Sequence, residues 1–219
     1  FIAQGSFSVA LGSSAAFNGQ KPESVAIGNF SGQFQQGTGS VAIGYNAGQN
    51  EQAVKSIAIG YSAGIFFQGA QSIAIGKEAG YNTQESDSIA IGHLTGKDDQ
   101  GQYAIALGLS AGRLSQGSAS IAIGKFSSEI QQSSNCISIG NEAGRMNQSD
   151  RSIAVGYRSG YTAQGLSTIS IGEEAGFLEQ GNYCVSIGQK AGSIHQDKES
   201  IAIGRFAGQY TQGAYTVAI

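Results

Sequence analysis

The chain has 219 residues and a formal net charge of −3, with 34 glycines, one proline and no tryptophan. This small negative charge gives no electrostatic footprint for nucleic acid or for an anionic membrane surface. No apolar run approaches the ~20 residues of a transmembrane helix, and glycine without a three-residue period excludes collagen.

A 16-residue period runs through the whole sequence. Glycine recurs at every sixteenth position from Gly12 to Gly204. Glutamine does the same at Gln4, Gln20, Gln36, Gln52, Gln68, Gln84, Gln100, Gln116, Gln132, Gln148, Gln164, Gln180, Gln196 and Gln212. Helical arrays and propellers have longer repeats, of roughly 33 to 50 residues. The period therefore predicts an all-β, single-domain parallel β-solenoid (a β-roll) of 16 residues per coil and about 14 coils.

One continuous array is expected over residues 1–219, with no domain boundary inside it. Because the sequence opens at Phe1 in mid-repeat and stops at Ile219 in mid-strand, we expect it to be a fragment of a longer chain.

The predicted elements follow one another in the same order in every unit. Residues 57–59, Ile-Ala-Ile, alternate β-branched and small side chains, which predicts a strand, here called the aliphatic strand. Gly60 then opens a turn that contains a second glycine, Gly64, a residue suited to a corner of positive φ. Ala16 and Ser128 replace this second glycine in two units.

A weaker strand follows and ends at the periodic glutamine, as in residues 65–68; we call it the glutamine strand. Residues 69–71 form the turn that returns to the next aliphatic strand. Each unit thus supplies two strands and two turns.

The aliphatic strand has two faces that do not vary. One carries only Val, Ile or Leu, and the middle position on the other is always Ala or Ser. A solvent-facing strand position would carry different polar residues in different repeats, and neither face does so. Both faces are therefore expected to be buried. A single coil can bury only one face in its lumen, and the other needs a partner chain.

The narrow lumen of a 16-residue coil favours the small face and the glutamine inside, although the reverse arrangement stays open. The aliphatic face would then form an oligomer seam, which we assign to Ile57, Ile59, Ile73, Ile75, Ile89, Ile91, Ile121 and Ile123. The glutamines are expected to form a structural ladder, because coils about 4.8 Å apart superpose identical amides that can hydrogen-bond to one another.

The strand-glycine-turn unit, as in residues 56–63, Ser-Ile-Ala-Ile-Gly-Tyr-Ser-Ala, resembles the YadA-like head repeat of trimeric autotransporter adhesins. The resemblance covers the whole chain. It implies a left-handed parallel β-roll, three chains associated along their length, and attachment to surfaces. The ladder of glutamines is not the usual signature of that family, and the longer repeats also resemble those of fibre proteins of large viruses and phages.

Little in the sequence points to chemistry. Ser62 and Ser110 fall in Gly-x-Ser-x-Gly segments, but no helix follows and no acid or histidine is aligned with them. No His, Cys and Asp cluster has metal-ligand spacing. Cys136 and Cys184 share one small-residue position three coils apart, too far for a disulfide, and are expected to be free thiols that replace serine. No enzyme activity and no cofactor are predicted.

The sequence therefore predicts an extracellular structural and adhesive fibre or stalk, displayed on a cell or virion surface. Its expected partners are copies of itself, with a trimer favoured and end-to-end or lateral fibre contacts, and a host-surface or carbohydrate ligand; no membrane insertion is expected. The alternatives are a viral or phage fibre and a binding module for a periodic surface such as ice or polysaccharide, which would use the flat Ser/Ala/Gly face. Two sequons make Asn29 and Asn147 candidate glycosylation sites.

Overall fold

The computed structural model describes residues 4–219, so residues 1–3 of the predicted array lie outside the described part. The chain is an all-β parallel β-solenoid of about 13 turns with about 16 residues per turn, and no helix occurs among the described residues. The predicted fold class and coil length are confirmed, and the handedness stays a prediction.

The chain falls into two compact units, one up to Ser110 and one from Ala111. In the first unit the aliphatic strands are β1 (Val9–Leu11), β2 (Val25–Ile27), β3 (Val41–Ile43), β5 (Ile57–Ile59), β7 (Ile73–Ile75), β9 (Ile89–Ile91) and β11 (Ile105–Leu107). Its glutamine strands are β4 (Asn50–Gln52), β6 (Phe66–Gln68), β8 (Asn82–Gln84) and β10 (Asp98–Gln100). In the first coils, isolated bridges such as Asn18 with Phe34 take the place of glutamine strands.

The second unit repeats the arrangement. Its aliphatic strands are β13 (Ile121–Ile123), β15 (Ile137–Ile139), β17 (Ile153–Val155), β19 (Ile169–Ile171), β21 (Val185–Ile187), β23 (Ile201–Ile203) and β24 (Val217–Ala218). Its glutamine strands are β12 (Leu114–Gln116), β14 (Ile130–Gln132), β16 (Met146–Gln148), β18 (Thr162–Gln164), β20 (Leu178–Gln180) and β22 (Ile194–Gln196).

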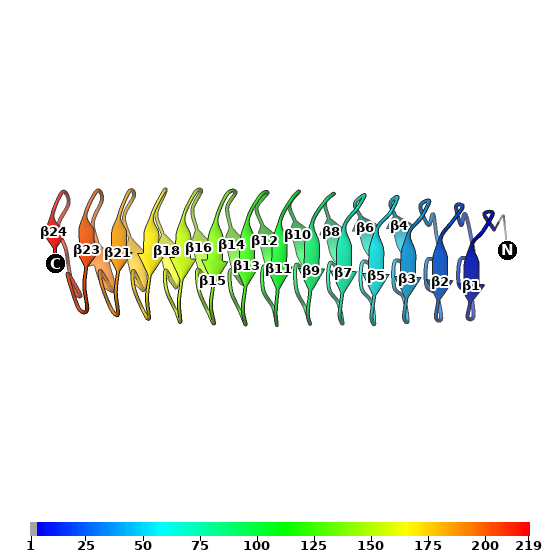
Figure 1. Cartoon of the computed structure of the whole chain (residues 1–219), viewed down its shortest axis with the longest axis horizontal. Coiled ribbons are helices and arrows are strands. Elements are labelled where there is room, and N and C mark those ends of the chain that lie inside the picture. Colours follow the sequence, from blue (N-terminus) through cyan, green and yellow to red (C-terminus); the bar gives the residue numbers. More distant parts are fainter. Residues whose placement is uncertain (1–3) are drawn as a thin grey trace. The chain divides into compact units, whose positions relative to one another are not determined.

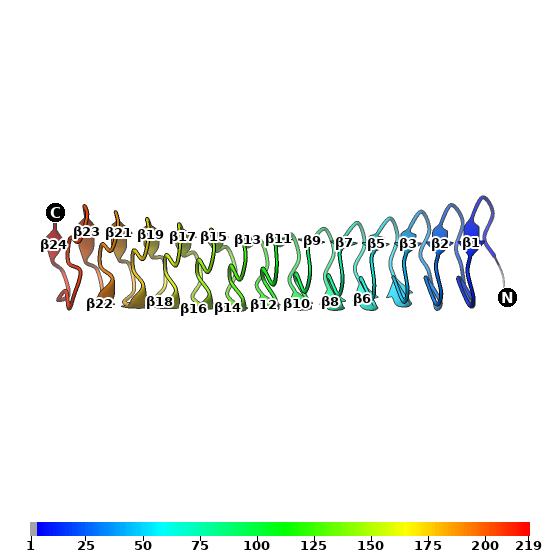
Figure 2. The same cartoon turned by 90° about the horizontal axis from the view of Figure 1, so that it is seen from below.

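Strands of one kind lie side by side in each unit and pair in parallel, as the arrows of β5, β7 and β9 show in Figure 1. The register is an exact 16-residue step: Ile57 pairs with Ile73, Ala58 with Ala74 and Ile59 with Ile75. Figure 2 shows that aliphatic and glutamine strands form two opposite layers of each coil. Equivalent residues of neighbouring coils are therefore stacked.

The interior of the coil holds small and amide side chains. In β5 the middle residue Ala58 is fully buried, while Ile57 and Ile59 on either side are only half-buried. The largest fully buried side chains of the described residues are mostly glutamines, such as Gln68. The preferred assignment of the faces is confirmed: the Ser/Ala face lines the lumen and the branched aliphatic face points away from it.

Each coil uses left-handed backbone more widely than its glycines predict. In one coil, Ser62 and Gln71 at the corners have φ of 56° and 58°, and Phe67 in the middle of β6 has a φ of 53°. Such a conformation costs a non-glycine residue about 1–2 kcal/mol. Hydrogen bonds to the neighbouring coil oppose this cost, as when the Ser62 amide donates to the Tyr45 carbonyl at 2.9 Å. Variable residues can therefore occupy corners where glycine is not obligatory.

Candidate functional site

The glutamine ladder ties each coil together in two directions. The Gln68 Nε2 donates across the lumen to the Ile57 carbonyl of the same coil at 2.7 Å. It also donates along the stack to the Gln84 Oε1 at 3.4 Å. Gln52 repeats both bonds, to Val41 at 2.8 Å and to Gln68 at 3.2 Å. The shorter bonds, which the sequence did not indicate, link the two layers of one coil, and the longer ones link consecutive coils.

The same geometry recurs along both units. Amide–amide bonds join Gln36 to Gln52 and Gln84 to Gln100 in the first unit, and Gln132 to Gln148, Gln180 to Gln196 and Gln196 to Gln212 in the second. Cross-lumen bonds are also made by Gln20, Gln36, Gln84, Gln100, Gln132, Gln148, Gln164, Gln196 and Gln212. At the start of the described residues, Gln4 is exposed and donates to the Ser8 carbonyl instead.

Serines in the middle of some aliphatic strands enter the ladder. The hydroxyl of Ser170 donates to the Gln180 Oε1 at 2.7 Å, and that of Ser186 donates to the Gln196 Oε1 at 2.6 Å. In return, the Gln180 Nε2 donates to the Ser186 Oγ at 2.8 Å. Where this position is Ala, the ladder consists of amides alone. Where it is Ser, the hydroxyl also hydrogen-bonds to the ladder glutamines.

We expect Gln68→Leu to lower the free energy of unfolding by about 1–3 kcal/mol, because it leaves the buried Ile57 carbonyl and the neighbouring amides without their partner. Chemical denaturation of the two proteins measures this difference. Gln102→Leu is the matched control, since this half-buried glutamine has no part in the ladder. Equal stability of Gln68→Leu and the parent chain would contradict a structural role for the ladder.

The residues of the predicted seam form two parallel rows on the outer side of the aliphatic strands. Ile57 and Ile73 belong to one row and Ile59 and Ile75 to the other. Seven of the eight assigned isoleucines are half-buried in the single chain, and Ile91 is 38% exposed. The rows continue through each unit, so apolar surface is repeated at every coil.

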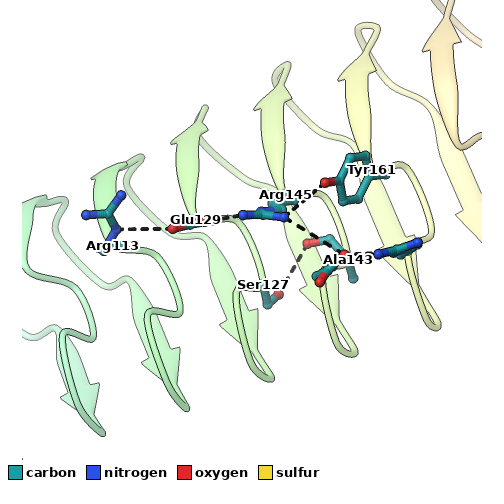
Figure 3. A network of polar contacts seen from close by, with 8 residues as sticks. Arg113, Ser127, Glu129, Ala143, Arg145 and Tyr161 are labelled. Atoms are coloured by element: carbon teal, nitrogen blue, oxygen red, sulfur yellow. Dashed lines mark hydrogen bonds and ion pairs between the residues drawn. The ribbon is translucent and has the colours of Figure 1, made fainter.

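A charged and aromatic edge runs along the second unit at the turn before the glutamine strands. The Glu129 carboxylate, 7% exposed, lies 3.3 Å from the Arg113 Nε and 2.8 Å from the Arg145 Nε. Arg145 also donates to the Tyr161 hydroxyl at 2.9 Å and packs over the Phe126 ring. Figure 3 shows the side chains of Glu129, Arg145 and Tyr161 following one another along the stack. The hydrogen bond to Glu129 raises the pKa of the Arg145 guanidinium.

A smaller edge of the same kind occurs in the first unit. Lys97 lies 2.9 Å from the Glu78 carboxylate and over the Tyr81 ring, and this hydrogen bond lowers the pKa of Glu78. Tyr45 and Tyr61 stack with ring centroids 5.3 Å apart. A solvent-accessible ion pair such as Lys97–Glu78 contributes only about 0–1 kcal/mol, so the smaller edge mainly fixes side-chain positions. Sequence reasoning missed both edges. The 16-residue spacing of Arg113, Glu129 and Arg145 could have indicated the larger one.

The two cysteines are buried free thiols, as predicted. Each replaces a serine whose hydroxyl bonds to a backbone carbonyl: the Cys136 Sγ lies 3.0 Å from the Ser149 carbonyl and the Cys184 Sγ 2.9 Å from that of Asp197. Burial raises the pKa of the Cys136 thiol. Such a thiol is a packing group rather than a nucleophile.

The remaining candidate residues lie apart from one another. Asn29 and Asn147 are exposed, and the hydroxyl of the first sequon, Ser31, is buried and bonds to the Gly28 carbonyl. Ser62 and Ser110 are 4% and 3% exposed, at left-handed corners rather than at a strand-to-helix turn.

Within residues 4–219 no group of three or more His, Cys, Asp or Glu side chains is arranged to hold a metal ion. In the same residues no helix has the length and apolar character needed to cross a membrane.

The YadA head domain repeat matches this chain in two copies, over residues 36–47. This segment contains β3 and the turn after it, the portion of the unit on which the sequence resemblance rests. No curated protein matches the chain. The chain is therefore a β-solenoid in which a segment is similar to the YadA head domain repeat.

Proposed function

We propose that this chain is the rod of a trimeric, adhesive fibre displayed on a cell or virion surface. The observation that carries the proposal is the pair of aliphatic rows on the outer side of every aliphatic strand, as at Ile57 and Ile59. Full burial of one such side chain contributes roughly 1.5–3 kcal/mol to stability. Because these side chains are only half-buried in the single chain, burying the rest against a partner chain would add part of this free energy to association. Because the rows recur in every coil, partner chains would associate along the whole length of the array.

Three copies are favoured because the matched repeat belongs to adhesins whose chains associate in threes. In this proposal the Val and Ile rows of three chains meet, and residues 1–219 form one continuous array. The glutamine strands and the charged edges remain on the outside, where side chains vary from coil to coil. Attachment would depend on these variable positions.

A purely structural and adhesive role fits the interior as well. Ala, Ser and Gln fill the coil, and the serines of both Gly-x-Ser-x-Gly segments, Ser62 and Ser110, are buried. The proposed function therefore includes no enzyme activity. The Ser/Ala face that a periodic surface such as ice would need lies inside the lumen, so that alternative has no accessible surface on this face.

Light scattering combined with an attachment assay tests this proposal. The purified chain should have three times the monomer mass, and beads coated with it should bind to mannan-, heparin- or gelatin-coated glass more than albumin-coated beads do. A monomeric chain whose beads bind none of these surfaces above the albumin level would refute the proposed function. A trimer that fails to attach would leave the fibre role and remove the adhesive one.

A further inference from the structure

A shallow polar cavity lies on the glutamine-strand side of the second unit. It has a volume of about 350 Å³ and extends over three coils, at β12, β14 and β16. Figure 2 shows these strands in succession along one layer of the unit. We call this cavity the polar groove. Ser115, Gln131, Ser133, Asn147 and Ser149 are among the residues that line it.

The polar groove is neutral and its side chains are unengaged. None of the five is hydrogen-bonded through its side chain to another residue in the part of the chain that the structure describes. Elsewhere on the surface, side chains one coil apart bond to each other, as Gln49 does to Gln33 and Arg205 to Gln189. The carboxylate of Asp150, which follows Ser149 in the sequence, accepts a hydrogen bond from the Ser134 amide.

Two related cavities at the same position of other coils have different chemistry. One includes Glu179 and His195, whose side chains pair with each other at 2.7 Å. The other includes Gln35 and the carboxylate of Glu51. The polar groove is therefore the one of these three cavities without an ionisable lining residue.

The backbone conformation is the same at three positions of the polar groove. Ser115, Gln131 and Asn147 have φ of 55°, 55° and 56°, and all three side chains are exposed. Consecutive coils therefore present amide and hydroxyl groups at a spacing of about 4.8 Å.

We propose that the polar groove binds an uncharged glycan that lies along the stack of coils. Sugar hydroxyls would exchange hydrogen bonds with Gln131, Asn147 and the groove serines. Neutral amides and hydroxyls both donate and accept, which suits a ligand of many hydroxyl groups and gives no advantage to a charged one. This inference rests on the proposed adhesive function and assigns it a location and a ligand class.

Calorimetric titration of the full chain tests the proposal, with cellohexaose, chitohexaose and mannohexaose as neutral probes and a heparin hexasaccharide as the charged probe. At least one neutral probe should bind saturably. The double variant Gln131→Glu and Asn147→Asp, which is nearly isosteric and exposed, should weaken that binding at least tenfold. Gln35→Glu makes the same change at the same position of another coil and should leave it unchanged.

Circular dichroism should show the parent spectrum for both variants, so that a loss of binding reports on the polar groove. If no neutral probe binds, or if the double variant binds as tightly as the parent, the polar groove is not a glycan site. Binding of heparin alone, or attachment of beads to gelatin alone, would overturn this inference and leave the adhesive function standing.

Discussion

Replacement of Gly60 by alanine is expected to lower the free energy of unfolding by about 2–6 kcal/mol, the largest effect of any single change considered for this chain. Gly60 has a φ of +132°, which side-chain-bearing residues rarely adopt. A Cβ there would also lie 2.5 Å from the carbonyl oxygen of Gly76 in the next coil, and both backbones are held by the parallel register. Neither backbone can move away from the added Cβ without loss of hydrogen bonds between the two coils.

Thermal and chemical unfolding of Gly60→Ala measure this effect, with Gly64→Ala as the control in the same coil. Gly64 has a φ of +54°, and its Cβ would meet the side chains of Gln68 and Ala58 rather than backbone. Ala16 and Ser128 already occupy the equivalent position, at φ of 49° and 46°. Gly64→Ala should therefore be much less destabilising, and equal losses from the two variants would contradict the backbone explanation.

The combined change of Ile57, Ile73 and Ile89 to aspartate is expected to convert the proposed trimer into monomers. These residues follow one another along one aliphatic row, paired in register. Three stacked carboxylates buried against partner chains would each carry a large desolvation penalty without a counter-charge. The coil itself should persist, because its lumen is formed by the opposite face of the same strands.

Sedimentation velocity gives the oligomeric state, and circular dichroism reports whether the coils remain folded. The matched control places three aspartates on consecutive glutamine strands: Asn50→Asp, Phe66→Asp and Asn82→Asp. It introduces the same charge repulsion on the other layer and should stay trimeric. Dissociation of both variants, or of neither, would show that the aliphatic rows are not the interface.

The strict period made the fold predictable, because any residue of one unit identifies its stacked counterparts in all the others. Ile57 and Ile73, or Gln68 and Gln84, could be paired from the sequence alone, and the narrow lumen indicated that Ala58 would face inward. The match of residues 36–47 to the YadA head domain repeat confirms the resemblance that the repeat unit indicated.

The remaining features depend on geometry that the period does not encode. The cross-lumen bond from Gln68 to Ile57 depends on the distance between the two layers of the coil, and the left-handed conformation of Phe67 inside β6 depends on the path of the backbone. The polar groove at Gln131 depends on which side chains of the glutamine strands point outward. The groove positions differ from coil to coil, so no repeated pattern signals them.

The interior of alanine, serine and glutamine gives the isolated coil an unusual thermal character. Heat capacity rises on unfolding when apolar surface is exposed and falls when polar surface is exposed. A lumen whose largest fully buried side chains are mostly amides contributes opposing terms, so the free energy of unfolding of the coils should curve only weakly with temperature. The heat-capacity change of the assembled fibre would then come mainly from the aliphatic rows, outside the fold of any one chain.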